Sequence, residues 1–158
     1  MKITIACVGK IKEKYFVDAI KEYSKRLSRY DKLEIVEVSD EKAPEILSEA
    51  QMQIVKNKEG ERLMKAIGEA YTIALCIDGK KLSSPDLAKL LSDKRVGGIS
   101  HICFVIGGSL GLSDEVIKRA DYRLSFSDMT FPHQLMRVIL LEQIYRAERI
   151  LANEPYHK

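Results

Sequence analysis

Three short segments that contain glycine or polar residues interrupt the sequence directly after apolar runs. They are Asp78-Gly79, the glycines of FVIGGSLGL (104–112) and SDMTFP (127–132). Glycine permits positive φ and lets a ligand approach the backbone closely. Ligands of open α/β sheets bind beyond the carboxyl ends of the strands. Each segment alone is equally well explained as an ordinary turn, but together they predict a small-molecule site.

The spacing of the glycines excludes the two common nucleotide-binding loops. A Walker loop requires GxxxxGK[ST], and no Lys-Ser or Lys-Thr follows Gly107 at the start of the next helix. The dinucleotide fingerprint GxGxxG is absent too, because GGxxG has a different order and follows the fourth predicted strand rather than the first. The glycines by themselves therefore do not identify the ligand.

Few titratable side chains lie near these segments. His133 follows Pro132 at a predicted helix start, and we interpret it as a positioning residue, with catalysis as the alternative. Arg137 lies one turn further along, where it either holds an anion or is a surface arginine. His101 stands at the opposite end of its predicted strand, so we expect it to be structural.

The hydrophobic pattern predicts strands and helices in alternation. Short β-branched or apolar runs predict strands at 2–8, 33–38, 72–77, 101–106 and 122–126. Helical spacing and capping signals predict helices at about 16–30, 44–67, 84–95, 113–120 and 132–153. Nearly continuous apolar strands indicate an α/β fold, with a mostly parallel sheet and helices on both faces. No linker or repeat is visible, so we predict one domain over residues 1–158.

The last predicted helix is too apolar for a surface element. Apolar residues cover well over one of its faces: Leu135, Met136, Val138, Ile139, Leu140, Leu141, Ile144, Tyr145, Ala147, Ile150 and Leu151. A chain of this size has little interior to cover a helix on all sides. We therefore expect part of the helix to be buried in a homodimer, and burial within the fold is the alternative.

Composition narrows the class of protein. The 158 residues are 46% hydrophobic and 31% charged, with no apolar run long enough to span a membrane. We expect a soluble cytoplasmic protein. The three cysteines lie in apolar stretches without CxxC pairs, so we expect packing roles and no metal. The net charge of +3 permits a nucleic-acid partner. Many basic residues lie within the first 32 positions, and they are explained by a solvated helix face or, alternatively, by a surface that binds phosphates.

Several stretches together resemble one protein family. FVIGGSLGL (104–112), LSFSDMTFPHQLMRVILLEQIYRA (124–147) and the ending PYHK (155–158) are similar to the bacterial ribosomal large-subunit RNA methyltransferase H family. MKITIACVGKIKEKY (1–15) and DEKAPE (40–45) fit the family as well, so the resemblance covers essentially the whole chain. That family belongs to the SPOUT superfamily and uses S-adenosylmethionine. It methylates ring nitrogen 3 of a pseudouridine in the large-subunit (23S) rRNA.

The resemblance implies a location for the cofactor, a knot and an assembly. S-adenosylmethionine would be held by Leu75, Gly107, Phe126, Ser127, Asp128, Met129, Thr130 and Phe131. Related sequences often carry another residue in place of Asp128, which puts a side-chain contact there in doubt. The resemblance also implies a C-terminal trefoil knot, which general folding rules do not predict, a homodimer, and a substrate within the assembled ribosome.

The implied reaction needs in-line positioning of the methyl donor and the acceptor, and loss of a proton from an imide nitrogen. A polar three-residue ending is usually frayed, but the resemblance assigns this ending to the active site. We therefore predict His157, Tyr156 and Arg137 as catalytic residues. The acceptor base must be unpaired or flipped, and the dimer surface, chiefly the basic first helix, must bind the RNA.

Two alternatives remain open from the sequence. A SPOUT methyltransferase with another RNA target would carry similar cofactor loops. A ribosome-binding module without catalysis would share the fold and would be indifferent to substitutions of Arg137 and His157.

Overall fold

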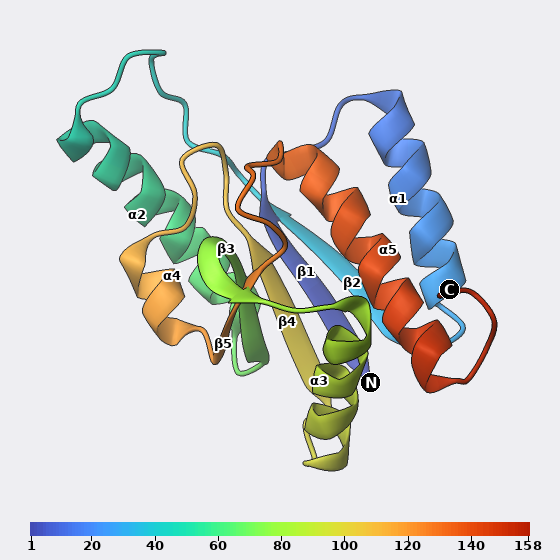
Figure 1. The fold of residues 1–158 in the computed structure, drawn as a ribbon. Coiled ribbons are helices and arrows are strands. Elements are labelled where there is room, and N and C mark those ends of the chain that lie inside the picture. The colour runs from blue at the N-terminus through green and yellow to red at the C-terminus, as the bar shows by residue number, and fades with distance from the viewer.

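In the computed structural model, residues 1–158 form five strands and five helices in strict alternation (Figure 1). The strands are β1 Lys2–Val8, β2 Lys32–Val38, β3 Tyr71–Lys81, β4 His101–Ile106 and β5 Tyr122–Ser125. The helices are α1 Lys14–Leu27, α2 Glu49–Ile67, α3 Ser84–Val96, α4 Asp114–Arg119 and α5 His133–Leu151. The predicted order of elements is confirmed.

All five strands belong to one parallel sheet with the order β2-β1-β4-β3-β5. Lys2 of β1 pairs with Lys32 on one side and with His101 on the other, so the three strands start at the same level. Because the strands are parallel, the loops that follow them all lie at one edge of the sheet. The prediction of a parallel α/β sheet is therefore confirmed.

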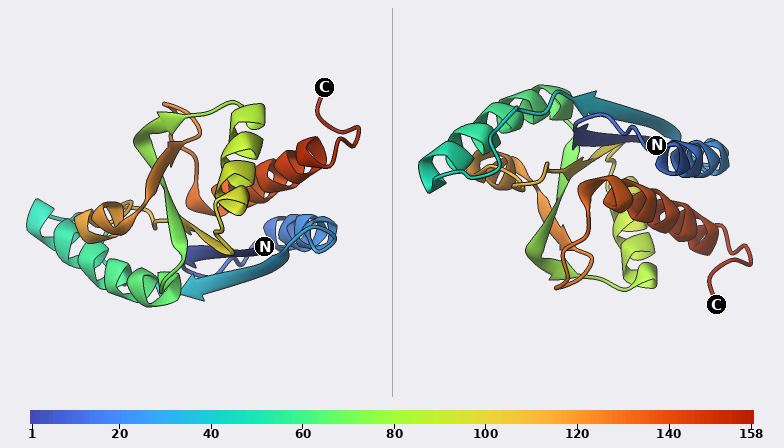
Figure 2. Two further views of the ribbon diagram at one scale, coloured as in Figure 1. Left: turned by 90° about the horizontal axis from the view of Figure 1, so that it is seen from below. Right: turned by 90° about the horizontal axis from the view of Figure 1, so that it is seen from above.

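Helices cover both faces of the sheet (Figure 2). α5 packs between α1 and α3 on one face, and α2 packs with α4 on the other. Two buried clusters correspond to these faces. The first contains Phe104 of β4 with residues of α3 and α5, and the second contains Val105 of β4 with residues of α2 and α4. Neighbouring residues of one strand thus support opposite layers, as the pleat requires.

Strand β3 is longer than predicted. Asp78-Gly79 does not end it, because pairing with β5 resumes at Lys80 after an irregularity that begins at Leu75. Gly79 crosses β5 so closely that a Cβ there would lie 2.8 Å from the carbonyl carbons of Arg123 and Leu124. Glycine is needed at this crossing because no side chain fits between the two backbones.

Helix α2 starts later than predicted. Pro44 lies in the preceding loop, and the helix is capped by Ser48, whose Oγ accepts from the backbone N–H of Gln51 at 3.2 Å. The Gln51 side chain accepts in return from the Ser48 N–H at 2.9 Å. This reciprocal capping box gives the Ser48 and Gln51 N–H groups hydrogen-bond acceptors, which a proline side chain cannot provide. Residues 39–48 are consequently a loop at the carboxyl edge of the sheet.

Helix α5 is buried in its own subunit more deeply than expected. Leu140, Leu141 and Ile144 have no exposed surface, because the core of the same chain covers them. Leu135, Val138 and Ile139 on the other side of the helix stay partly exposed. Burial within the fold therefore accounts for one face of the helix, and the homodimer stays a prediction for the other face. No helix is long and apolar enough to cross a bilayer, and the trefoil knot stays a prediction.

Helices α2 and α4 touch at Gly60, which is buried. A Cβ at Gly60 would lie 2.3 Å from the Oγ of Ser113 and 3.0 Å from its Cβ. Ser113 is the N-cap of α4, and its Oγ accepts from the Val116 N–H at 3.3 Å. The close approach of the helices therefore depends on the missing side chain.

Gly60→Ala should lower the free energy of unfolding by about 1–3 kcal/mol, the usual cost of overpacking. The loss should appear although alanine favours a helix over glycine by about 1 kcal/mol. Urea unfolding followed by circular dichroism measures it, with Glu61→Ala on the exposed face as the control. Ser113→Gly removes the clashing atoms at the cost of the cap, so the double variant should recover most of the loss. A neutral Gly60→Ala would contradict this packing argument.

Candidate functional site

A small pocket of about 260 Å³ lies where the ends of β3, β4 and β5 meet. Three loops or strand ends build its walls. β3 contributes Leu75, Cys76 and Ile77; β4 and the glycine loop contribute Ile106, Gly107, Gly108, Gly111 and Leu112; β5, the following loop and the start of α5 contribute Leu124, Ser125, Phe126, Ser127, Met129, Thr130, Phe131, His133 and Met136. The glycine loop and most of SDMTFP (127–132) meet at this pocket, whereas Asp78-Gly79 is not part of the lining and the preceding residues of β3 take its place.

The glycine loop is held in a tight turn by its own backbone. Gly111 has a φ of +86° and donates its N–H to the Gly108 carbonyl at 3.0 Å. A Cβ on Gly107 would lie 2.6 Å from the carbonyl carbon of Gly111. Gly107 is therefore required for closure of the loop, and the loop then presents main chain rather than side chains to the pocket.

The segment after β5 is fixed by serine hydroxyls. Ser125 Oγ donates to the Ser127 carbonyl at 3.1 Å, and Ser127 Oγ accepts from the Met129 N–H at 3.0 Å. Asp128 lies outside the pocket lining, because its carboxylate is exposed and forms an ion pair with Lys81. Seven of the eight residues predicted to hold the cofactor therefore line the pocket, and Asp128 is the exception.

No lysine, arginine, aspartate or glutamate lines the small pocket. His133 is the most basic group in the wall, and its pKa is lowered by burial and by the charge of Arg137. Burial and the carboxylate of Asp78 raise the pKa of the Cys76 thiol, which therefore stays neutral. Cys76 was predicted to be a packing residue and instead faces the pocket. Met136 was missed as well, although its spacing of three from His133 on a helix indicates a shared face.

Arg137 is buried beneath the loops and not on the surface. Its side chain is 2% exposed. Nη2 donates to the carbonyls of Val8 and Gly9 at 2.7 and 2.8 Å, and Nη1 donates to the Glu37 carboxylate at 2.8 Å. The guanidinium therefore ties α5 to the ends of β1 and β2. In this arrangement it positions the backbone, and its terminal nitrogens are already engaged.

The C-terminal tail, residues 154–158, is folded back on α5 rather than frayed. Tyr156 Oη donates to the Glu142 carboxylate at 3.0 Å, and its ring packs edge-on against Tyr145 with centroids 4.9 Å apart. The Arg146 guanidinium lies 4.7 Å from the centre of the Tyr156 ring, and its Nη1 is 3.3 Å from His157 Nδ1. Burial and the bond to Glu142 raise the pKa of Tyr156. Sequence reasoning missed Glu142 and Arg146 as partners of the tail, although both follow Val138 at helical spacing.

Within one chain the tail and the small pocket are far apart. His133 at the start of α5 lines the pocket, and the tail follows Leu151 at the other end. The tail folds back as far as Glu142 and Arg146, which lie 9 and 13 residues beyond His133, so about 14–20 Å of helix still separates Tyr156 and His157 from that residue. The structure of one subunit therefore does not bring His157 or Tyr156 to the pocket, and their predicted catalytic role is not tested by it.

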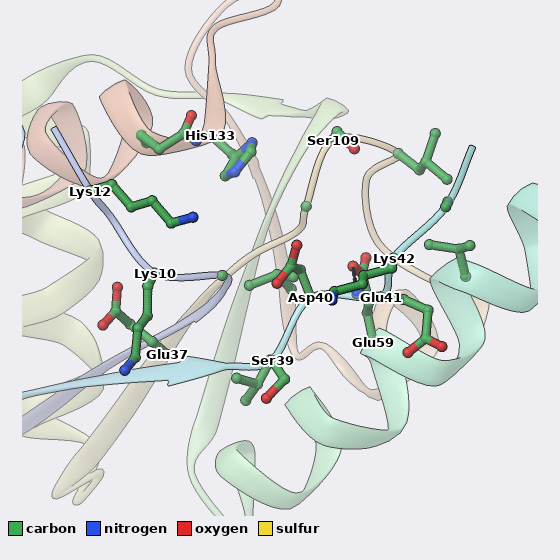
Figure 3. Close-up of a pocket in the computed structure, with 18 of the residues that line it drawn as sticks. Lys10, Lys12, Glu37, Ser39, Asp40, Glu41, Lys42, Glu59, Ser109 and His133 are labelled. Atoms are coloured by element: carbon green, nitrogen blue, oxygen red, sulfur yellow. Dashed lines mark hydrogen bonds between the residues drawn. The ribbon is translucent and has the colours of Figure 1, made fainter. Parts of the chain in front are cut away.

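A second, larger cavity of about 870 Å³ opens beside the small pocket (Figure 3). We name it the large cleft. Its lining comprises residues 8–10, 12–13, 37–45, 47, 55, 59, 108–110 and 133–134. Gly108 and His133 belong to the walls of both cavities. The two cavities therefore adjoin at the glycine loop and at the start of α5. No group of three or more potential metal ligands was found.

The fold is shared with solved methyltransferase structures. A "probable methylase family protein" from Haemophilus influenzae Rd KW20 superposes with a TM-score of 0.58 over 99% of this chain and 70% of that chain, at 14% identity. The tRNA (m1G37) methyltransferase from Aquifex aeolicus gives 0.54 over 92% of this chain and 70% of that chain, also at 14% identity. Similarity at this level of identity establishes the architecture alone.

Sequence comparison extends the likeness to a family. The family model described as "Predicted SPOUT methyltransferase" matches residues 1–157. "Ribosomal RNA large subunit methyltransferase H" from Clostridioides difficile (strain 630) is 65% identical, and the protein of that name from Bacillus pumilus (strain SAFR-032) is 57% identical. Both matches cover 100% of each chain. The chain therefore belongs to the SPOUT methyltransferases and, within them, to the ribosomal RNA large subunit methyltransferase H family.

Proposed function

We propose that this protein transfers a methyl group from S-adenosylmethionine to ring nitrogen 3 of a pseudouridine in 23S rRNA, on the assembled ribosome. The observation that carries the proposal is the uncharged pocket built from the glycine loop and the segment after β5, in a chain that matches "Ribosomal RNA large subunit methyltransferase H" proteins along its whole length. The family name supports the RNA class, and the choice of base rests on the resemblance of the sequence.

The pocket fits a sulfonium cofactor better than a phosphate-bearing one. A phosphate is bound by lysine, arginine or a series of N–H donors in the wall. The lining contains neither basic side chain, and the Gly111 N–H is already bonded to the Gly108 carbonyl. A sulfonium carries a positive charge, which a neutral His133 does not repel. Apolar walls from β3 and the Phe126–Phe131 loop suit a flat purine ring, with main-chain groups as hydrogen-bond partners. The volume of about 260 Å³ is close to the lower limit of ligand pockets.

The bound cofactor would supply an electrophilic methyl group, and the chain must do the rest. The glycine loop and the Phe126–Phe131 loop hold and orient the donor. The acceptor imide must lose its proton, and His157 is the group that we assign to accept it. Tyr156 is held by Glu142 and stacks on the exposed base, while Arg137 keeps the ends of β1 and β2 in place.

The separation of tail and pocket indicates that two chains build each active site. Tyr156 and His157 contact Glu142 and Arg146, so about 14–20 Å of α5 separates them from His133 in one chain. The tail of one subunit would therefore act at the pocket of the other. An apolar stripe on the surface supports a homodimer: Phe16, Val17, Leu135, Val138 and Ile139 are partly exposed and do not pack against either core cluster. α1 and α5, which carry these residues, lie side by side (Figure 1).

Methyl transfer itself is tested with labelled S-adenosylmethionine and ribosomes from a strain that lacks the endogenous activity. Label should appear at ring nitrogen 3 of one pseudouridine in 23S rRNA, and naked rRNA should be a poorer substrate. Label in another nucleotide would assign a different RNA target. Absence of label, with ribosome binding retained, would indicate a non-catalytic module.

Met136→Lys should weaken S-adenosylmethionine binding by roughly tenfold to hundredfold. Two like charges about 6 Å apart at an effective dielectric of about 20 repel by about 2.8 kcal/mol, and partial exposure reduces this figure. S-adenosylhomocysteine has no sulfonium charge, so its affinity should fall much less. Calorimetry with both ligands measures the ratio, and Met136→Gln is the uncharged control. Equal losses for both ligands would mean that the sulfonium does not bind here.

Mixed dimers test the sharing of the active site. A subunit with Met136→Lys retains its tail, and a subunit with His157→Ala retains its pocket. The His157→Ala homodimer should lose about 10²-fold in methylation rate, and the Met136→Lys homodimer should lose about tenfold to hundredfold at subsaturating S-adenosylmethionine. A purified dimer with one subunit of each kind should recover about half of the wild-type rate, because one intact pocket meets one intact tail.

One outcome of the mixed-dimer experiment would contradict a shared active site, and a monomeric variant serves as a control. Inactive mixed dimers would show that pocket and tail act within one chain. Ile139→Asp, on the partly exposed face of α5, should give folded monomers without activity in sedimentation and methylation assays. Leu140→Asp is unsuitable for this purpose, because Leu140 is completely buried in its own subunit.

A further inference from the structure

The large cleft and the small pocket meet at a shared wall. Gly108 and His133 line both cavities, so a group bound in one would lie close to a group bound in the other. The volume of about 870 Å³ lies in the upper part of the range for ligand sites and accommodates a nucleotide. The cleft thus has the position and the size that an acceptor beside the methyl donor requires.

Three lysines of the cleft have no carboxylate partner. Lys10, Lys12 and Lys42 are exposed and form neither an ion pair nor a side-chain hydrogen bond, whereas fifteen ion pairs engage other cations of the chain. Figure 3 shows the Lys12 side chain directed into the cavity from the loop after β1. An ammonium group without a partner can bind a phosphate oxygen without first breaking an ion pair.

The inner wall of the cleft offers acceptors rather than cations. Glu59 of α2 is 5% exposed and has no cationic partner. Its Oε2 accepts the Glu41 N–H at 3.0 Å, which fastens the loop 39–48 to α2. Its Oε1 would lie 3.0 Å from a Cβ on Gly108, so Glu59 packs against the glycine loop. Asp40 extends into the cavity opposite His133 (Figure 3). Carboxylates in these places accept hydrogen bonds from the N–H groups of a base.

We propose that the large cleft binds the RNA strand around the acceptor nucleotide, with Lys10, Lys12 and Lys42 on its phosphates and the Asp40 and Glu59 wall facing the base. The inference rests on the proposed function, because it takes the neighbouring pocket as the methyl-donor site. Glu13 and Glu45 also line the cleft without partners, so the attraction for RNA comes from individual lysine contacts rather than from net charge.

The test compares the Lys12→Gln/Lys42→Gln double variant with wild type in steady-state methylation of ribosomes. KM for ribosomes should rise roughly tenfold, while kcat and the affinity for S-adenosylmethionine change less than about twofold. The slope of log affinity against log salt should fall by about 0.7 for each lysine removed. Glu45→Gln should change KM in the opposite direction by a few fold, because it removes a repulsive charge from the lining.

Lys65→Gln is the matched control, since Lys65 is exposed and unpaired in the last turn of α2, at the opposite edge of the sheet. Unchanged KM and salt slope in an active enzyme would overturn the role of the cleft and leave the proposed function intact. Loss of cofactor affinity instead would assign the cleft to the methyl donor. If the wild-type protein transfers no methyl group, the proposed function fails. Filter binding of ribosomes to the same variants then tests separately whether the large cleft binds RNA.

Discussion

The bonds of Arg137 to the end of β1 determine how the rest of the site is built. A buried ion pair adds little net stability, because both charges lose water. Its contribution here is positional, since the planar fork fixes two carbonyls and one carboxylate at defined angles. Loss of the guanidinium would remove the donor to the Val8 and Gly9 carbonyls and leave Glu37 with the hydrogen bond from the Ile11 N–H. Because Glu37 is one-third exposed, the cost should be smaller than the about 3–5 kcal/mol of a fully buried pair. The start of α5 is therefore held over the ends of β1 and β2, on the opposite side of the sheet from β5.

This anchor forces the chain to cross the carboxyl edge of the sheet. β5 is the edge strand, and β3 and β4 separate it from β1. The segment 126–132 must therefore pass the ends of both strands before α5 begins. It meets the glycine loop on the way, and the small pocket lies between these two segments. Because Gly107 and Gly111 close that loop through backbone contacts, the wall contains no charged side chain. A pocket built in this way suits a ligand that combines an uncharged ring with a positive charge, as S-adenosylmethionine does.

Much of the fold was predictable because its signals are local. β1 and β4 have the predicted bounds, and Ser83 and Ser113 cap the predicted helices, because β-branched runs and capping residues act within a few positions. The errors came from contacts distant in sequence. Gly79 was taken as the end of a strand because its packing against β5 is invisible without the sheet order. Pro44 was taken as the start of a helix because a proline favours the first turn, whereas the capping box of Ser48 and Gln51 starts the helix later.

The site was predictable to the extent that it consists of loops after strands. The order of parallel strands brings such loops to one edge, whatever side chains they carry. The large cleft was not foreseen, since it requires the loop after β2 to be fastened to α2 by Glu59. Nothing in the sequence pairs Glu41 with Glu59. The burial of Arg137 was likewise missed, because a helix position one turn from a loop gives no indication of which way a long side chain points.

The length of α5 sets a requirement for any dimer that joins tail and pocket. One end of the helix lines the pocket and the other carries the tail. If two α5 helices paired in parallel, each tail would lie beside the tail of the partner, and it would be no closer to the partner's pocket than to its own. Antiparallel pairing instead places the last turn of one helix beside the first turn of the other. The exposed stripe of Leu135, Val138 and Ile139 lies in the first half of α5, and Glu142 and Arg146 continue it toward the tail. In an antiparallel pair, the polar half of one helix, which carries the tail, would lie beside the apolar half of the other helix, which lines the pocket. The chain that holds the methyl donor would then not have to supply the groups that act on the acceptor.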